Sequence, residues 1–393
     1  MAGSGAGVDL TWPEETSCKI MRNPEDQRQN LAQAILNVRS RRATSRRTLA
    51  DVMRLSPTTA GFYADQLIES GYLRESGLEQ GTMGRPKRSL GTVAGAGWFA
   101  GIEFNAERVQ GVRVNFSGQM TGSGQRPLSA GDDTKQVMSE IKNLIVTLTR
   151  GAPGPLLGIG LGAPGVVDPQ RGVGVYYAFL PDWKEVPVAA QLHRRFKVPV
   201  TLENNLRAIA LAERWFGGAQ QLSDYLILGP RSGFGIAMVI GGSIIGGVHH
   251  AAGEVGLWPW PDRGSGAHMH DQLSSPAVWR RLKGAGPRAR LPADLRAALA
   301  ACADPASEAW KEVVRDYAQV LAMVQLLLDT TTCFLHGPLT ALGERFCRDV
   351  CSAIPRVAPS LQGRLPVLIP SKLGDDAGAL GAASLAMEAW MPE

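Results

Sequence analysis

Residues 44–72 read TSRRTLADVMRLSPTTAGFYADQLIESGY, and the signals in this stretch predict two short helices joined by a tight turn. The first helix covers residues 44–53, with a hydroxyl residue as its cap and apolar Leu49, Val52 and Met53 on one side. Ser56 can cap the second helix, and Pro57 suits its first helical position. This second helix runs to about residue 70, where glycine follows. The N-terminal region is therefore expected to contain a helix-turn-helix.

A hairpin is predicted directly after the second helix. Residues 72–76 and 87–90 can pair as strands across a glycine-rich tip, which contains Gly81, Gly84, Arg85 and Pro86. Two helices followed by such a hairpin form the layout of a winged helix-turn-helix, a module that binds duplex DNA. The sequence therefore indicates double-stranded DNA as a partner.

Charge supports this interpretation. Between residues 27 and 92 the chain carries eleven Arg and Lys against five Asp and Glu, a balance of +6, whereas the whole chain is only +5. The positive field is thus concentrated on one small segment, as phosphate neutralisation requires. The alternative is that arginines at helix ends are merely solvated.

The candidate DNA-binding residues come from the two helices and the hairpin tip. Thr58, Thr59 and Tyr63 can contact bases, thymine methyl groups or phosphates, and Arg85 can enter a minor groove. Phe62 cannot make the bidentate contact to guanine that an arginine makes, and it either faces DNA or belongs to the core. The full predicted set is Ser45, Arg46, Arg47, Ser56, Thr58, Thr59, Phe62, Tyr63, Gly84 and Arg85.

Length and composition bound the rest of the chain. With 393 residues, the chain can form two or three domains. No apolar run approaches 18 residues, so a membrane span is not expected. Five cysteines far apart fit a reducing cytoplasm, where we expect the protein to reside. Residues 1–25 are predicted to be a flexible tail, and residues 26–92 the DNA-binding domain.

Beyond a hinge at residues 91–97, strands and helices alternate, which predicts an α/β architecture in two lobes with a cleft between them. The expected strands cover residues 98–105, 108–115, 156–162, 198–202, 224–228 and 235–240. The expected helices cover residues 133–149, 188–196, 206–215 and 308–328.

Six segments in a fixed order give this chain a resemblance to the ROK family, which comprises repressors, open reading frames and sugar kinases. The segments are GRP at 84–86, GIGLGAPGVVD at 158–168, LPDW at 180–183, ENN at 203–205 with ALAE at 210–213, AAGEVG at 251–256 and GALGAA at 378–383. The resemblance covers residues 26–390. It implies an actin-like, ribonuclease H-like sugar-kinase fold over residues 98–393. One lobe would contain residues 98–204 with the C-terminal helix 376–391, and the other residues 205–375.

Departures from the family pattern argue against phosphoryl transfer. Asn205 stands where the family's kinases have an Asp as general base, and an amide cannot accept the proton of a sugar hydroxyl at neutral pH. The first phosphate turn carries Glu107, whose charge would repel phosphate. The second carries Pro230, which lacks a backbone donor, and the adenosine-side glycine pair has become Gly337-Pro338. We expect no enzymatic activity and no cofactor.

The family's structural zinc also lacks its expected ligands. Leu257 stands at the position of the family's His, and the Cys-rich loop is replaced by residues 258–266. His268, His270 and Asp271 offer three metal ligands within four residues; the preferred interpretation is a solvated loop, without metal.

The family grips sugar hydroxyls through five positions, which imply an effector site. Asn204 and Glu254 match the pattern, whereas Asn205, Leu257 and Phe179 depart from it. Because Phe179 and Leu257 are apolar, a hydroxyl-rich ligand would be under-bonded. The pocket is expected to take a less polar effector or none, and the retained Asn204 and Glu254 can equally be structural.

These observations predict a DNA-binding transcriptional regulator, a repressor by expectation, with a catalytically inactive kinase-like domain. Its partners would be double-stranded DNA, a carbohydrate or another small-molecule effector, and a second copy of the chain in a homodimer or dimer of dimers. The alternatives are an active sugar kinase with an appended DNA-binding module and a pseudokinase scaffold that binds another protein.

Overall fold

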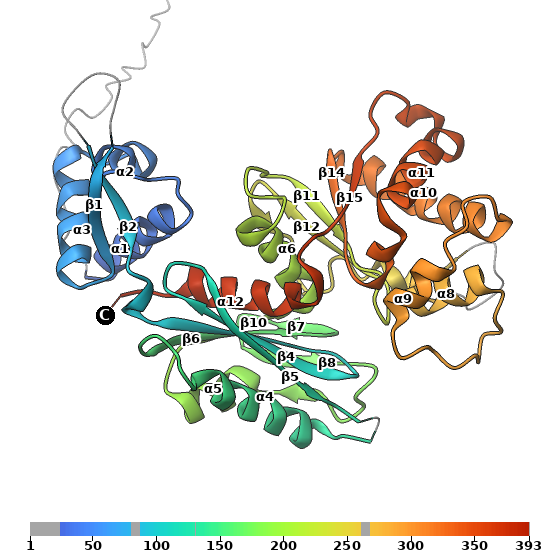
Figure 1. The fold of residues 1–393 in the computed structure, drawn as a ribbon, viewed down its shortest axis with the longest axis horizontal. Helices are drawn as coiled ribbons and strands as arrows, with labels where there is room; N and C mark the ends of the chain where they lie inside the picture. Colours follow the sequence, from blue (N-terminus) through green and yellow to red (C-terminus); the bar gives the residue numbers. More distant parts are fainter. Residues whose placement is uncertain (1–23, 80–86, 130, 261–267, 393) are drawn as a thin grey trace, which may run out of the picture. The chain divides into compact units, whose positions relative to one another are not determined.

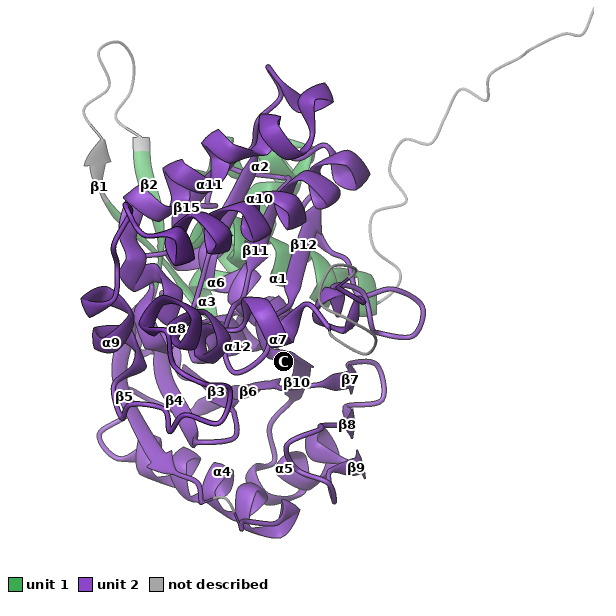
Figure 2. Ribbon diagram, turned by 90° about the vertical axis from the view of Figure 1, so that its right-hand side faces the viewer, with its two compact units in different colours: residues 1–92, 391–393 green, residues 93–390 purple. Residues whose placement is uncertain are grey.

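The computed structural model describes residues 24–79, 87–129, 131–260 and 268–392. The chain divides into two compact units (Figure 2): unit 1 comprises residues 1–92 with 391–393, and unit 2 comprises residues 93–390. Among the described residues, no helix is long and apolar enough to cross a membrane.

Unit 1 consists of three helices and a two-stranded antiparallel hairpin. The helices are α1 (Pro24–Arg39), α2 (Arg46–Met53) and α3 (Pro57–Glu69), and the strands are β1 (Leu73–Glu79) and β2 (Lys87–Thr92). The two predicted helices and the hairpin are confirmed. Helix α1 was not predicted, and it begins at Pro24, inside the segment 1–25 that was expected to be a flexible tail; residues 1–23 lie outside the described residues.

Local capping explains why α2 and α3 start where they do. The Ser45 hydroxyl accepts a hydrogen bond from the Thr48 amide at 3.2 Å, and the Thr48 hydroxyl accepts one in return from the Ser45 amide at 2.9 Å. At the start of α3 the Ser56 hydroxyl accepts a hydrogen bond from the Thr59 amide at 3.1 Å, and Pro57 follows. Caps of this kind satisfy amides that a helix start otherwise leaves unpaired. The predicted cap positions are therefore confirmed.

Unit 2 contains two five-stranded sheets, each of which defines one lobe (Figure 1). In lobe one the strand order is β10-β6-β3-β4-β5. Strands β10, β6 and β3 are parallel, and β4 is antiparallel to both of its neighbours, β3 and β5. These strands are β3 (Trp98–Phe104), β4 (Arg108–Asn115), β5 (Met120–Pro127), β6 (Leu156–Ala163) and β10 (Val200–Asn204). A small sheet is formed by β7 (Val166–Asp168), β8 (Val173–Tyr176) and β9 (Lys184–Val186).

Helices cover both faces of the lobe-one sheet (Figure 1). Helices α4 (Thr134–Thr149) and α5 (Val188–Phe196) bury their apolar sides on one face, against residues such as Ile102 and Leu161. Helix α12 (Ala377–Ala389) lies on the opposite face, close to Gly101 and Gly160. Helix α6 (Asn205–Phe216) begins directly after β10 and packs against α12.

The lobe-two sheet has the order β13-β12-β11-β14-β15. Its strands are β11 (Tyr225–Leu228), β12 (Ile236–Ile240), β13 (Ser243–Ile244), β14 (Thr332–Leu335) and β15 (Val367–Pro370). Its main helices are α8 (Ser275–Lys283), α9 (Leu295–Ala301), α10 (Glu308–Leu328) and α11 (Gly343–Val357). The predicted α/β architecture is confirmed. The predicted strand at 198–202 is shifted, because the pairing with β6 begins only at Val200.

Candidate functional site

Arg46 joins three elements of unit 1. Its guanidinium pairs with Asp65 of α3 at 2.6 Å and with Glu75 of β1 at 2.7 Å. Hydrogen bonds from Arg46 lower the pKa of both carboxyl groups. The predicted DNA contact of Arg46 therefore competes with an internal role, in which this side chain ties α2 to α3 and to the hairpin.

Two predicted DNA contacts require correction. Tyr63 is 1% exposed and lies in the core of unit 1, because it occupies the side of α3 that packs inward. The expectation that it touches bases is therefore wrong for this structure. Ser45 is buried and its hydroxyl caps α2, so that it too has a structural role.

The remaining predicted residues divide by exposure. Arg47, Ser56 and Thr58 are exposed, Thr59 is half-buried, and Phe62 is 50% exposed. Phe62 is therefore not a core residue, which resolves the alternative left open by the sequence. Gly84 and Arg85 lie outside the described residues.

Several further cations of unit 1 are exposed besides Arg47. They occupy the turn before α2, the C-terminal cap of α2 and the hairpin: Arg41, Arg42, Arg54, Arg74 and Arg88. Of these, Arg88 also pairs with Glu75 at 3.3 Å. The charge balance predicted a basic surface, although it could not tell which arginines form internal ion pairs.

In unit 2, the side chains of Asn204 and Asn205, two residues of the predicted effector site, form internal hydrogen bonds. The Asn204 side chain caps α6 by accepting from the Leu206 amide at 2.9 Å, and it donates to the Gly165 carbonyl at 3.0 Å. Asn205 donates to the Glu103 carboxylate at 3.2 Å. Asn204 is also buried, which favours its structural interpretation.

Arg207, which the sequence did not single out, links α6 to residues 246–252. Its side chain is 2% exposed; it pairs with Glu203 at 3.0 Å and donates to the His250 and Ala252 carbonyls at 2.5 and 3.2 Å. Burial raises the pKa of Glu254, and the nearby charge of Arg207 opposes that shift. The structure thus brings Glu254 close to the start of α6.

Phe179 and Leu257 are 61% and 59% exposed. Phe179 packs beside Tyr177 with 5.6 Å between ring centroids, and Leu257 ends a short 3-10 turn after Glu254. A cavity of about 430 Å³ lies elsewhere in lobe one, lined by Lys142, Pro187, Gln191, Arg194 and Arg195. The structure therefore does not gather the five predicted effector residues around that cavity.

The two turns that would cradle phosphate use their donors internally. In the turn after β3, the Glu107 and Arg108 amides both donate to the Asn105 side chain, at 2.8 and 2.9 Å. In the turn after β11, the Arg231 amide donates to the Gly229 and Gly233 carbonyls, and Pro230 has no amide hydrogen. The Arg231 side chain forms an ion pair with Glu103.

The described residues do not bring together the ligands of the family's structural zinc, which the sequence already lacked. Leu257 is exposed at the position of the missing His, and the described cysteines lie in other segments, at residues 302, 333, 347 and 351. Cys333 and Cys347 are buried, and burial raises the pKa of the Cys347 thiol to about 12, as expected for side chains packed in the core.

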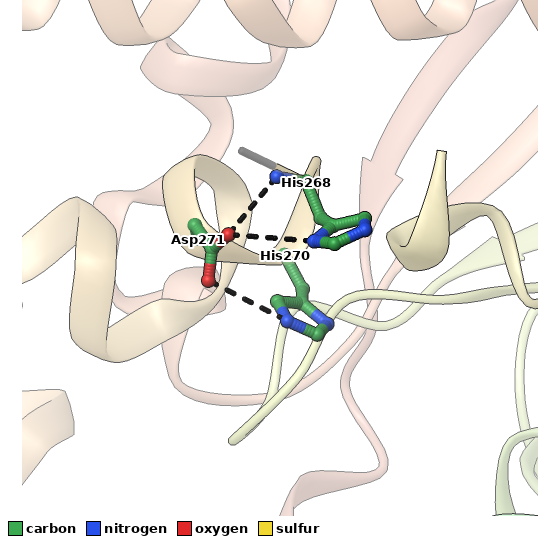
Figure 3. A group of neighbouring side chains, drawn as sticks. All are labelled: His268, His270 and Asp271. Atoms are coloured by element: carbon green, nitrogen blue, oxygen red, sulfur yellow. Dashed lines mark hydrogen bonds and ion pairs between the residues drawn. The ribbon is translucent and has the colours of Figure 1, made fainter. Parts of the chain in front are cut away.

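His268, His270 and Asp271 lie together at the start of α7 (His270–Leu273), with potential ligand atoms within 4.8 Å of one another (Figure 3). Asp271 accepts a hydrogen bond from the His268 amide at 2.9 Å. The three side chains are 40–49% exposed, in agreement with a solvated group.

A second internal network lies in lobe two. Glu213 of α6 accepts hydrogen bonds from His336 at 2.8 Å, from the Gly218 amide at 2.8 Å and from Ser371. Glu213 and His336 are both buried. Sequence reasoning missed this network, because His336 and Ser371 lie 123 and 158 positions along the chain from Glu213.

Acid is expected to weaken this network. Burial would raise the pKa of Glu213, but the hydrogen bonds from His336 and Ser371 outweigh it and the pKa is lowered. A carboxyl group with a lowered pKa contributes stability above its unfolded pKa, about 4.3, and loses that contribution as pH falls through the folded pKa. Glu213→Gln should therefore destabilise unit 2 by about 2 kcal/mol at pH 7.

The difference should shrink as the pH falls below 4, as measured by calorimetric unfolding of the wild type and the variant. Glu308→Gln, at an exposed position, is the control. An undiminished difference for Glu213→Gln at low pH would contradict the assignment.

The sequence was compared with protein families and with known proteins. The sequence pattern of the ROK family matches residues 99–389. The chain is 28% identical over 215 residues to the "Xylose repressor" of Caldicellulosiruptor bescii, covering 54% of each chain. It is 26% identical over 219 residues to the "DNA-binding transcriptional dual regulator NagC" of Escherichia coli K12, covering 54% of this chain and 52% of that one. The chain thus spans about half the length of these curated relatives.

Solved structures resemble the fold over a longer range. A ROK family transcriptional regulator described as a homologue of the Escherichia coli MLC protein superposes with a TM-score of 0.76 at 20% identity, covering 92% of this chain and 97% of that one. A ROK family glucokinase from Streptomyces griseus, solved with glucose and AMPPNP, superposes with a TM-score of 0.62 at 21% identity, covering 74% and 99%. The match of the family pattern over most of unit 2 establishes the relationship: this chain belongs to the ROK family.

Proposed function

We propose that this protein is a DNA-binding transcriptional regulator, a repressor by analogy with its relatives, whose unit 2 does not transfer phosphoryl groups. The observation that carries the proposal is the set of exposed arginines on a unit that contains a helix-turn-helix and a hairpin. Phosphate contacts supply most of the affinity of such modules for DNA.

Helix α3 is the candidate recognition helix. Ser56 and Thr58 are exposed at its N-terminal end, where recognition helices commonly meet base edges. Phe62, one turn further along and 50% exposed, suits apolar contact with a thymine methyl group. Arg47 at the start of α2 suits a phosphate contact.

The inactivity of unit 2 is supported by the chemistry of its cleft. Asn205 occupies the position of the family's general base, and its amide donates to Glu103 rather than accepting a proton. The Glu107 and Arg108 amides after β3 and the Arg231 amide after β11 already donate hydrogen bonds within their own turns. Phosphoryl transfer depends on positioned donors and a base or orienting group, and Asn205 and these three amides do not supply them.

The relatives are named for xylose and for transcriptional regulation, which suggests a carbohydrate or related small molecule as effector. A homodimer would present two copies of α3 to a near-palindromic operator, in keeping with the symmetry of such regulators. Effector binding would then alter the half-site spacing that the dimer fits.

Selection of bound genomic fragments by the purified chain tests this proposal. A recovered palindrome with two half-sites supports a dimeric regulator, whereas fragments without a shared motif contradict it. Incubation with Mg-ATP and a panel of hexoses and amino sugars tests the second part, because turnover above background would restore the kinase alternative.

Arg47→Ala should lower affinity for duplex DNA nearly uniformly across sequences and reduce the slope of log K against log salt by about 1, because one phosphate contact is lost. Fluorescence anisotropy over a range of salt concentrations measures both quantities. Arg194→Ala, which removes an exposed arginine from α5, is the control and should leave both unchanged. An unaltered salt slope for Arg47→Ala would remove this residue from the interface.

A further inference from the structure

One ion pair joins the two lobes of unit 2, between β3 and the turn that follows β11. Glu103 lies near the end of β3 in lobe one, and Arg231 lies in the turn after β11 in lobe two. Their side chains form an ion pair and are 4% and 23% exposed. Asn205 donates a second hydrogen bond to the same carboxylate at 3.2 Å. The pair is therefore largely withdrawn from solvent, where charge attraction is strong.

The backbone around Arg231 is fixed. Its amide donates to Gly229 and Gly233, and its carbonyl accepts from the Ser275 amide at 3.0 Å. The Ser275 hydroxyl, buried at the start of α8, donates to the Pro230 carbonyl. The guanidinium therefore extends from a rigid turn.

Glu103 is equally confined. A Cβ atom at Gly378, the second residue of α12, would lie 2.1 Å from the Glu103 carboxylate. The carboxylate thus occupies space that only glycine leaves open, and it has little room to turn away from Arg231.

A second link lies near the first. Asp375, just before α12, pairs with Arg108 of β4 at 3.3 Å and with Arg296 of α9 at 3.4 Å. Arg108 belongs to lobe one and Arg296 to lobe two. Asp375 also acts electrostatically on Arg231, so both links stabilise the same arrangement of the lobes.

We propose that Glu103 serves as a built-in anion for Arg231: the pair holds the two lobes together without a ligand and keeps phosphate-bearing molecules from binding to the Arg231 guanidinium. A guanidinium that already holds a carboxylate has less capacity for phosphate, and the buried carboxylate repels a second anion. The inference goes beyond the proposed function, because it concerns how unit 2 sets its conformation and its ligand class whether or not the chain binds DNA.

The test uses the intact chain and the variants Glu103→Gln, Arg231→Gln and the double variant. Each single change leaves one charge buried without its partner, so the thermal midpoint of unit 2 should fall by roughly 5–10 °C. Hydrogen exchange should accelerate about tenfold or more in peptides covering residues 98–104 and 229–235. The double variant should be no less stable than either single variant, since no unpaired charge remains.

Inorganic phosphate provides the second readout. In Glu103→Gln the guanidinium is released, so 10–50 mM phosphate should raise the thermal midpoint by several degrees. Wild type and Arg231→Gln should not respond. If a variant fails to fold, Arg231→Lys, which keeps the charge, takes its place. Hydrogen exchange of the same peptides in Arg231→Lys should be faster than in the wild type and slower than in Arg231→Gln.

The matched control is Arg126 and Glu140, which pair at 3.4 Å within lobe one, between β5 and α4. Their Gln variants should leave exchange in residues 229–235 and the phosphate response at wild-type values. Equal exchange in wild type and the Glu103 and Arg231 variants would overturn the role of the pair in holding the lobes together. Phosphate stabilisation of the wild type as large as that of Glu103→Gln would overturn the exclusion of anions. Neither readout involves DNA, so failure here is separate from failure of the proposed function.

Discussion

Gly160→Ala is expected to destabilise unit 2 by at least about 3 kcal/mol, the upper end of what overpacking a core costs. Gly160 lies in β6, and a Cβ atom there would lie 1.7 Å from the Ala382 carbonyl oxygen of α12. The obstacle is helix backbone, which cannot rotate away like a side chain. Helix α12 would have to lift from the sheet.

Calorimetric unfolding of unit 2, with circular dichroism to verify the fold, measures the effect. Gly286→Ala is the matched control, because a Cβ atom there meets nothing within 4 Å; it should change stability by less than about 0.5 kcal/mol. Similar small effects for both variants would show that α12 does not depend on close approach to β6.

The same close approach recurs on both sides of α12. A Cβ at Gly101 of β3 would lie 2.0 Å from the Ala379 carbonyl, and one at Gly381 of α12 would lie 1.8 Å from the Ala208 carbonyl of α6. Helix α12 is thus held between the lobe-one sheet and α6 by backbone contacts. This packing requires glycine at Gly160 and Gly381, which belong to the family segments 158–168 and 378–383.

Most helices and strands could be predicted because caps and apolar periodicity are properties of neighbouring residues in the chain. Helix α10 was expected over residues 308–328 and has those bounds, since Ser307 caps it and its apolar periodicity extends over the whole helix. The C-terminal part of β10 was missed because the extent of this strand depends on its pairing with β6. The residues of one strand do not specify the register of that pairing.

Side-chain roles were harder to predict than elements. Phe62 and Tyr63 are neighbours on α3, yet one is 50% exposed and the other 1%. Successive helical residues differ by about 100° in direction, so the choice between them depended on how α1 and α2 pack. Glu103 and Arg231 are 128 positions apart, and only the tertiary fold brings such charges together.

Arg207→Met is expected to destabilise unit 2 by about 3–5 kcal/mol, because it removes one partner of a buried ion pair. Glu203, 12% exposed, would keep its charge without compensation. The His250 and Ala252 carbonyls would lose the donor that holds residues 246–252 against α6. Loss of this nearby positive charge should also raise the pKa of Glu254 further, because Arg207 at present opposes the effect of burial.

Two measurements separate this role from a general loss of packing. Hydrogen exchange should accelerate most in peptides covering residues 246–254, and calorimetry gives the change in stability. Lys311→Met breaks an exposed ion pair with Glu308, whose side chains are 57% and 82% exposed, and should change stability by no more than about 0.5 kcal/mol. If the amides of residues 246–254 exchanged as slowly in Arg207→Met as in the wild type, the Arg207 guanidinium would not be what holds this segment, and Glu254 within it, in place. Because Met nearly matches the length of the arginine stem, a selective loss of protection would assign the effect to the guanidinium and its hydrogen bonds.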